Sequence, residues 1–361
     1  MDETLYRRDF MKLGFLAASG IGFIPVINGC ATTKKSSSKK LEPVHYPKLP
    51  GRKLQPPEHY GLKGCYTGIV ELFGPLIEYQ RQFEQLPSIY LQAYSTGDFL
   101  FQFLITKKDS EDDYYAQGVI PFITFDMEGP MSNNSLKDIA KGKIDSTLKS
   151  YAKMSRLVGE EYGGLFVRSM REMNATGYFP WQGSARNFKK AWRHMHDIFS
   201  DEGANEYATW IWEIFVGHRK FVDNADFFYP GDDYVDWIGL DGFNEGNSCL
   251  RGNCINGSFY KIFNYGYSRM LRSHRKKPQM IVEMGTCINN RKALWIEETF
   301  RTIKYNMTGI KALLWFSMYW SHGNVKNCDS RINYPSEALE AYREAISDQY
   351  FLGPIPKKIR N

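Results

Sequence analysis

The sequence predicts a (β/α)8 barrel (TIM barrel), a fold of the α/β class, in a single domain after an N-terminal signal and tether. Eight short apolar or β-branched segments recur along the chain, and stretches with the periodicity of amphipathic helices occupy most of the gaps between them. Alternating strands and helices are typical of a parallel sheet, and eight such units close a barrel. A doubly wound open sheet is the alternative, but no glycine-rich phosphate loop follows the first expected strand.

The expected elements follow one another without a tandem sequence repeat. Strands are expected at residues 61–68, 88–95, 118–125, 163–170, 207–214, 234–241, 279–285 and 310–317. Helices are expected near residues 72–84, 138–158, 185–199, 258–273, 293–306 and 335–347. Of the 361 residues, 43% are hydrophobic and 15% aromatic, which is enough apolar material for the core of one large domain.

The net charge of the chain is concentrated at its N-terminus. The formal charge is +6, but residues 1–40 contribute +4 of it, so the rest of the chain carries only +2. A nearly neutral domain rich in Trp and Tyr gives no electrostatic reason to expect a nucleic acid as its partner.

Residues 1–29 resemble an export signal, with a basic start, an apolar stretch and small residues before Cys30. Arg7 and Arg8 fit a twin-arginine pattern, and the residues before Cys30 resemble the cleavage site of a bacterial lipoprotein, in which that cysteine is lipidated. The alternative is an uncleaved membrane anchor over residues 13–29, although that stretch is short for a span.

The segment that follows the signal is rich in Lys, Ser and Pro, so we expect residues 30–58 to form a tether and residues 59–361 the barrel. The protein is then an extracytoplasmic monomer in the bacterial cell envelope, held on a membrane by its lipid. Disulfides persist in that compartment.

Five cysteines remain beyond Cys30. Cys249 and Cys254 are close enough in sequence to close one loop, Cys287 can pair with Cys328, and Cys65 is then a buried free thiol. A zinc site is the alternative use of these cysteines. It is disfavoured because no CxxC pair and no histidine at ligand spacing accompanies them.

Acidic side chains lie where the expected strands end, which is where barrel enzymes carry their chemistry. Glu172 follows the fourth strand and Glu283 ends the seventh, and these two strands face each other across a barrel mouth. Asp126, Glu213 and Asp241 occupy similar places at the third, fifth and sixth strands. We expect Asp241 to be structural.

Two opposed carboxyls are what hydrolysis of a glycosidic bond requires, because one protonates the leaving oxygen and the other attacks the anomeric carbon or activates water. Tryptophans offer flat apolar faces for sugar rings. A glutamate at a barrel mouth is also compatible with a plain ion pair, and a tryptophan with a place in the core.

The chain resembles glycoside hydrolase family 26, the family of (β/α)8 retaining glycosidases that includes β-mannanases, over about residues 61–342. The family's fourth strand ends in a pattern like R-x-x-H-E-M-N-G, and here Arg168 to Asn174 read RSMREMN, with GYFPWQG at 177–183. The sixth-strand block YPGDDYVDWIGLDGFN (229–244) and IVEMG (281–285) continue the resemblance in the same order.

The resemblance implies that Glu172 is the general acid/base and Glu283 the nucleophile of a retaining double displacement, with their carboxyls roughly 5–5.5 Å apart. Arg168 is expected to bond to Glu283 and keep it ionised. The chemistry needs no metal and no organic cofactor. The residues expected to contact sugar are Arg168, Arg171, Asn174, Trp181, Trp212, Phe243, Trp315 and Asp126.

Two positions depart from the family pattern. Arg171 stands where the family usually has His before the acid/base, and Phe243 stands where a Tyr hydroxyl is common. Both departures bear on the choice of substrate.

We therefore expect a lipid-anchored retaining endo-β-glycosidase that acts on a β-linked, mannan-like polysaccharide. The alternatives are a carbohydrate-binding or exopolysaccharide-assembly lipoprotein with a weak or inactive cleft, and an enzyme that remodels the cell's own exopolysaccharide.

Overall fold

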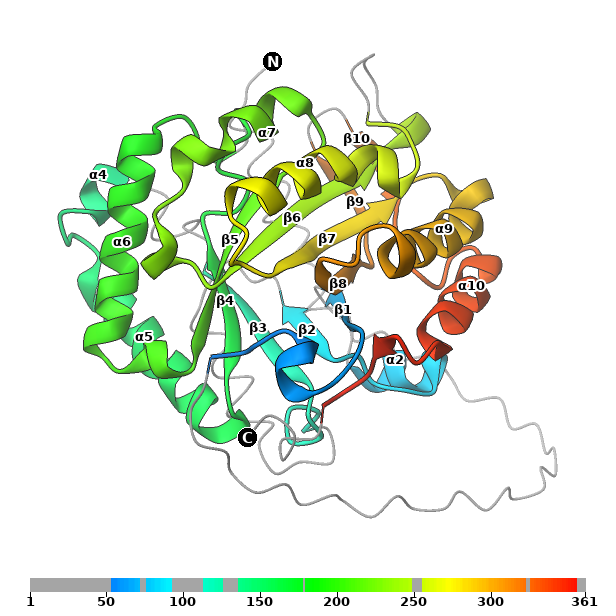
Figure 1. Ribbon diagram of the computed structural model, residues 1–361, viewed down its shortest axis with the longest axis horizontal. Helices are drawn as coiled ribbons and strands as arrows, with labels where there is room; N and C mark the ends of the chain where they lie inside the picture. Colours follow the sequence, from blue (N-terminus) through cyan, green and yellow to red (C-terminus); the bar gives the residue numbers. More distant parts are fainter. Residues whose placement is uncertain are drawn as a thin grey trace, which may run out of the picture. The chain divides into compact units, whose positions relative to one another are not determined.

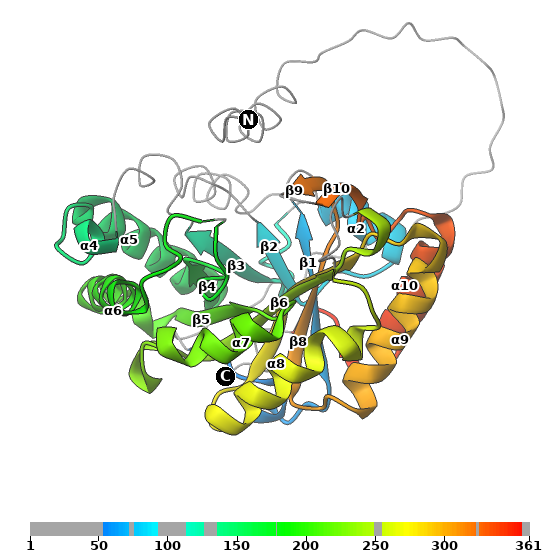
Figure 2. The same ribbon diagram turned by 90° about the horizontal axis from the view of Figure 1, so that it is seen from above.

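The computed structural model describes residues 53–71, 76–92, 113–125, 136–177, 179–248, 255–322 and 325–355. Within these residues, eight parallel strands pair in the order in which they occur along the chain, and the first pairs with the last (Figure 1). Seen from above, α5 and α6 flank one side of this barrel, and α9 and α10 flank another (Figure 2). The fold is the predicted (β/α)8 barrel.

The barrel strands are β1 (Cys65–Glu71), β2 (Ile89–Gln92), β3 (Ile120–Phe125), β4 (Leu165–Ser169), β5 (Ala208–Phe215), β6 (Trp237–Asn244), β7 (Gln279–Thr286) and β8 (Ile310–Phe316). The helices are α2 (Leu76–Phe83), α4 (Leu136–Ile139), α5 (Asp145–Tyr162), α6 (Ala185–Asp201), α7 (Arg219–Ala225), α8 (Phe259–Ser273), α9 (Lys292–Tyr305) and α10 (Ser336–Ser347). An antiparallel hairpin, β9 (Tyr319–His322) and β10 (Val325–Asp329), follows β8, and β11 (Phe351–Leu352) pairs with β1. Single 3-10 turns are η1 (Pro57–Tyr60), η3 (Ala204–Glu206), η4 (Asp226–Phe228), η5 (Asp232–Tyr234), η6 (Gly246–Ser248) and η7 (Asn289–Arg291).

All eight expected strands overlap the observed ones, while three helical or strand features differ. The helix expected at 138–158 is two helices, α4 and α5, separated by a turn that contains Gly142 at φ 81°. The short α7 and the β9–β10 hairpin were not predicted. Both are too short to show a clear hydrophobic period, and the hairpin sequence is polar.

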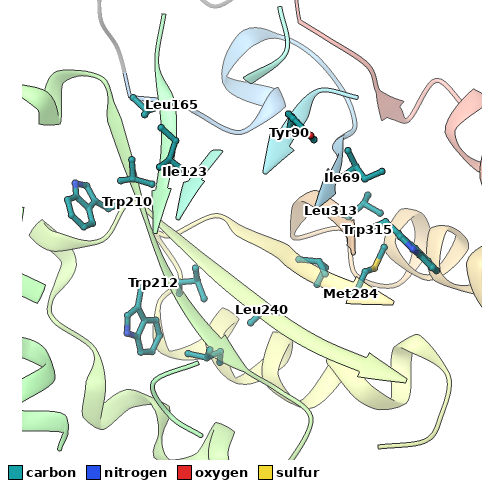
Figure 3. Packing of buried hydrophobic residues seen from close by; sticks show 14 of the residues in the cluster. Ile69, Tyr90, Ile123, Leu165, Trp210, Trp212, Leu240, Met284, Leu313 and Trp315 are labelled. Carbon is teal, nitrogen blue, oxygen red and sulfur yellow. The ribbon is translucent and has the colours of Figure 1, made fainter. Parts of the chain in front are cut away.

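Alternation along the strands builds two apolar layers. Inward side chains such as Phe166 and Ile211 fill the barrel, and outward ones such as Leu165 and Trp210 pack under the helices (Figure 3). The helices present a matching face. In α6, Ser184 accepts a hydrogen bond from the backbone N–H of Asn187 and so caps the helix. The buried face of α6 consists of Phe188, Ala191, Trp192, Met195, Ile198 and Phe199.

The amino end of the barrel is closed by the segment that enters it. Leu54 lies in the inner layer, and its N–H donates to the Thr209 hydroxyl over 2.7 Å, at the start of β5. The Lys53 ammonium pairs with Asp236 at 2.8 Å, just before β6. Residues 53–58, which we expected in the tether, therefore belong to the barrel, because Leu54 fills the space below the first layer of strand side chains.

Cys287 and Cys328 form a disulfide, which joins the segment after β7 to β10, and Cys65 is a buried free thiol. The Cys249–Cys254 pairing and the lipidation at Cys30 lie outside the described residues. None of the helices in the described part of the chain has both the length and the apolar character that a bilayer span needs.

Candidate active site

Arg168 is the centre of the site at the carboxyl end of the barrel. It lies on β4 with its side chain inside the barrel and is completely buried. Its Nε donates to the Thr124 hydroxyl on β3 over 2.8 Å, one terminal nitrogen pairs with Glu213 on β5, and the other pairs with Glu283 on β7. A planar guanidinium suits this role, because it presents separate donors in fixed directions.

Glu283 faces the barrel interior because the register of β7 shifts next to it. Leu240 of β6 stands opposite Ile281, but Asp241 stands opposite Glu283, so Val282 has no partner. Such a local shift is what a β-bulge produces, and it allows Val282 and Glu283 both to point inward. Val282 indeed packs in the inner apolar layer. Strict alternation would have turned Glu283 towards the helices, away from Arg168 inside the barrel.

Glu172 lies three residues beyond β4 on a strained turn. Its φ is 51°, in the left-handed region that non-glycine residues seldom occupy, and Met170 of the same turn has φ 49°. Backbone strain of this kind persists only where the surroundings enforce it, and it is common at active sites. The side chain of Glu172 is half-buried, which leaves it accessible at the barrel mouth.

The aromatic loop after β4 enforces this turn. The indole N–H of Trp181 donates to the Arg171 carbonyl over 2.7 Å, and the Gln182 amide donates to the Glu172 carbonyl over 2.9 Å. Asn174 exchanges two hydrogen bonds of 2.9 Å with the backbone of Phe215 at the end of β5. The turn that carries Glu172 is thus fixed from both sides.

This arrangement corrects two of the expected sugar contacts. Trp181 is 1% exposed and stacked on Phe179, so neither face of its ring is open to a sugar. Asn174 is also buried, and both ends of its amide are used by Phe215. Both residues hold the turn of Glu172. Arg171 is half-buried, with its guanidinium 4.8 Å from the centre of the Phe179 ring, and it stays a candidate for substrate contact.

The structure also corrects the expected contact of Trp212 and Trp315 with sugar. Both are completely buried in the apolar layer between the strands and the helices (Figure 3). Trp212 packs against Tyr229 and His274, and the Trp315 indole donates to the Ser330 carbonyl over 2.7 Å. Because alternate strand residues face opposite ways, the positions next to each tryptophan face the barrel instead. Asp126, the remaining expected contact, lies outside the described residues.

An aromatic wall lies at the carboxyl ends of β6 and β8. Phe243 meets the Phe316 and Trp320 rings edge-on, with centroids 5.2 Å away in both cases. Phe243 is nearly buried, while Phe316 and Trp320 are partly exposed. The Cys287–Cys328 disulfide lies in a small apolar cluster against which Trp320 packs. Phe243 therefore supports the wall, and Phe316 and Trp320 are the rings with an accessible surface.

Two further carboxyls, Glu213 and Asp241, complete the site. Neither was expected from the sequence to belong to it. Burial raises the pKa of Glu213 to about 7, while the charge of Arg168 opposes this rise and that of Glu283 adds to it. Burial also raises the pKa of Asp241 well above its usual range, and the charges of Glu172, Glu283 and Glu213 act in the same direction. Asp241 thus sits within the electrostatic reach of both expected catalytic glutamates. Burial and the neighbouring carboxylates thus favour the protonated forms of Glu213 and Asp241.

The sequence held a signal for these two residues. Glu213 follows the inward Ile211 by two positions, and Asp241 follows the inward Trp237 by four, so both share the inward face at the carboxyl ends of adjacent strands. Applying the period of two from the inward apolar residue of each strand would have placed both carboxyls in the barrel.

With this geometry in place, comparison with known proteins gives the family. The model of Glycosyl hydrolase family 26 matches residues 122–302, which include β4 to β7 with Arg168, Glu172 and Glu283. The chain belongs to glycosyl hydrolase family 26. The family resemblance drawn from the sequence is confirmed.

Two relatives with polysaccharide-degrading names match parts of the chain. Endoglucanase H of Acetivibrio thermocellus is 32% identical over 246 residues, which is 65% of this chain and 25% of that protein. The Beta-1,3-xylanase TXYA of a Vibrio species is 23% identical over 116 residues, 32% of this chain and 24% of that protein. The chain thus spans about a quarter of the length of these relatives.

Solved structures of family 26 share the fold. The catalytic domain of an endo-beta-1,4-mannanase from Bacillus sp. JAMB-750 superposes with a TM-score of 0.62 at 16% identity, over 82% of this chain and 89% of that one. A beta-mannanase from Bacteroides ovatus superposes with a TM-score of 0.60 at 14% identity, over 82% and 92%. At this level of identity the likeness concerns the barrel and not the substrate.

Proposed function

We propose that the chain is a retaining endo-β-glycosidase that hydrolyses a β-linked polysaccharide, with Glu172 as acid/base and Glu283 as nucleophile. The observation that carries this proposal is the placement of Glu283 on Arg168 inside the barrel, at the same mouth as the strained turn of Glu172. Membership of a glycosyl hydrolase family supports the reaction class.

In the first step, Glu283 attacks the anomeric carbon with a carboxylate electron pair, and the bond to the leaving oxygen breaks. Glu172 gives its proton to that oxygen, so the leaving sugar departs as a neutral alcohol. In the second step, Glu172 takes a proton from water, which attacks the same carbon and releases Glu283 as a carboxylate. Arg168 pairs with the Glu283 carboxylate at the start and at the end of the cycle.

For the substrate class, we favour a β-glucan backbone over the mannan-like polymer that the sequence led us to expect. Two observations support this choice. Arg171 replaces the histidine of the family pattern with a longer, charged donor, and the relative with substantial sequence identity is named an endoglucanase. The solved mannanases share only the fold with this chain. Mannan and xylan therefore remain in the test panel.

The test is the release of reducing sugar by the purified full-length protein from mixed-linkage β-glucan, glucomannan, galactomannan, β-1,4-xylan and β-1,3-xylan. Activity on one polymer that disappears in Glu283→Gln supports the proposal, and Glu172→Gln is expected to lose roughly 10²–10⁴-fold. NMR of the first product must show the anomeric configuration of the substrate.

A polysaccharide that binds and is not cut by the wild-type protein would overturn the hydrolase proposal. That outcome would favour the carbohydrate-binding or exopolysaccharide-assembly alternative. Release from the cell's own exopolysaccharide, without release from plant polymers, would instead point to a remodelling enzyme.

We also propose that Cys30 anchors the protein in the bacterial cell envelope through a lipid. The sequence before Cys30 supports this proposal, and the entry of the chain at the amino end of the barrel is compatible with it. Leu54 and Lys53 bond to residues at the starts of β5 and β6, at the end of the barrel opposite to Glu172 and Glu283. Metabolic labelling with a fatty acid, lost in Cys30→Ser, is the test.

A further inference from the structure

The double displacement needs two carboxyls, but Arg168 binds a third one. Glu213 is 2% exposed, and one of its oxygens pairs with the Arg168 guanidinium. Its other oxygen has no hydrogen-bond partner among the residues that the structure describes. A carboxyl buried in this way carries a cost in stability that its single ion pair does not clearly recover. A role in the reaction would account for its presence.

We propose that Glu213 is a positioning residue that keeps Arg168 in place and charge-balanced while Glu283 carries the sugar. This inference rests on the proposed function, since it assumes a covalent intermediate at Glu283. Glu213 does not touch the reacting atoms in this view and acts only through Arg168.

The need for such a residue follows from the charges of the first step. When the bond between Glu283 and the anomeric carbon forms, the carboxylate becomes a neutral ester, and the lost negative charge reappears on Glu172. Arg168 is fully buried and loses the ion pair that Glu283 supplied. Thr124, which also bonds to it, is uncharged. Glu213 already contacts the guanidinium and does not react, so it can supply the counter-charge.

When the ester forms, the charges around Glu213 change in a way that favours its ionised form. The charged groups are Arg168 on β4, Glu172 after β4, Asp241 on β6 and Glu283 on β7. The charge of Glu283 raises the pKa of Glu213 more than that of Glu172 does. Moving one negative charge from Glu283 to Glu172 therefore lowers the pKa of Glu213. Its ionised form becomes more favourable at the stage at which Arg168 needs it.

The test uses Glu213→Gln, which keeps the shape of the side chain and removes its charge, in the full-length protein. A 2-deoxy-2-fluoro glycoside with a good leaving group traps the ester, and its formation and reactivation are timed separately. Without the Glu213 charge the ester is destabilised most, and the transition states on both sides, in which Glu283 has lost part of its charge, are destabilised in part. We expect formation about tenfold slower and reactivation about tenfold faster than in wild type, as removal of one partner of a buried charge pair implies.

Two further variants separate this role from simple structural support. Thr124→Val removes a neutral bond to the same guanidinium, so any effect should slow both steps. Glu213→Asp keeps the charge, so its ester should reactivate more slowly than that of Glu213→Gln. Slowing of both steps in Glu213→Gln, or equal reactivation of the Gln and Asp variants, would overturn the inference.

The two proposals fail in different ways. If wild type gains no mass at Glu283 with the trapping reagent, the covalent mechanism itself is wrong, and the inference falls with it. If wild type is labelled at Glu283 and Glu213→Gln reactivates no faster, the glycosidase proposal stands and the role of Glu213 is refuted.

Discussion

Asp241 and Glu283 stand opposite each other on neighbouring strands, one register step away from where regular pairing would place them. Leu240 and Ile281 pair as expected, and the next pair along the strands skips Val282. This single skipped residue turns the expected nucleophile into the barrel, where Arg168 binds it. The geometry of the site therefore depends on a backbone irregularity as much as on the side chains.

The first prediction concerns the space that this irregularity needs. A Cβ at Gly239 of β6 would lie 2.5 Å from Val282 Cγ2, 2.9 Å from Ile211 Cγ2 and 3.2 Å from the Glu213 Cβ. The methyl group of Gly239→Ala would therefore collide with Val282, at the register shift of β7, and would displace Glu213. We expect a loss of about 1–3 kcal/mol in the free energy of unfolding. Activity should fall as well, and urea unfolding together with kcat measures both effects.

The matched control is Gly353→Ala, because the nearest atom to a Cβ there is the Leu86 carbonyl oxygen at an ordinary 3.5 Å. It should leave stability and kcat close to wild type. Equal behaviour of the two variants would mean that the register shift tolerates a methyl group at Gly239.

Much of this molecule was predictable from the sequence, for identifiable reasons. The alternation of strand and helix patterns predicted the barrel. Glu172 after a buried strand and Glu283 at the end of another were expected at the barrel mouth, and the structure places both there. These features follow from periodicity and from the geometry common to barrels, so no contact between distant residues had to be known.

The predictions about site residues that were wrong or incomplete share one cause, because the sequence did not show in which direction each side chain points. Trp212 and Trp315 lie on strands near the mouth but point under the helices, and Trp181 is turned inward by its bond to the Arg171 carbonyl. Glu213 follows the period of two and was placed at a strand end without a role, whereas Glu283 breaks that period through a register shift. Such a shift depends on how three strands pair, which a single strand's sequence does not show.

A second prediction follows from the bond between Trp181 and the turn of Glu172. Trp181→Phe keeps an aromatic ring and removes the hydrogen bond to the Arg171 carbonyl. The free energy of unfolding should fall by about 1 kcal/mol. Because the strained turn then loses one of its restraints, kcat should fall severalfold with a smaller change in KM.

The control for Trp181 is Trp192→Phe. Trp192 is equally buried, and its indole donates to the Tyr234 carbonyl over 2.9 Å, but it lies on α6 outside the barrel. A similar loss of stability without a change in kcat is expected. If both variants lower kcat alike, the effect of Trp181 is one of general stability.

A third prediction concerns the disulfide between Cys287 and Cys328. It joins segments 41 residues apart in sequence and lies in the cluster that supports Trp320. Replacing both cysteines by serine should lower the free energy of unfolding by about 2–4 kcal/mol. It should also raise KM for the polysaccharide, because the aromatic wall with Phe243 loses its support. Dithiothreitol should remove the difference in stability and in KM between wild type and the double variant, because reduction breaks this disulfide in wild type.

A fourth prediction concerns how the free energy of unfolding depends on pH. The raised pKa of Glu213 sets the direction of this dependence. Its pKa is raised from 4.5 to about 7 in the folded protein, so between these values the folded state holds a proton that the unfolded state has lost. The free energy of unfolding must therefore fall as pH rises through this window, by up to about 3 kcal/mol from this group. Asp241, whose pKa is also raised, acts in the same direction.

Glu213→Gln removes this contribution, so its stability should decline less than that of wild type between pH 5 and pH 8. Urea unfolding at several pH values measures the difference. Glu297→Gln, an exposed carboxyl on α9, should leave the wild-type slope unchanged. If Glu213→Gln and wild type decline in parallel, Glu213 is ionised across the whole range in the folded protein, and the raised pKa of this cluster belongs to Asp241.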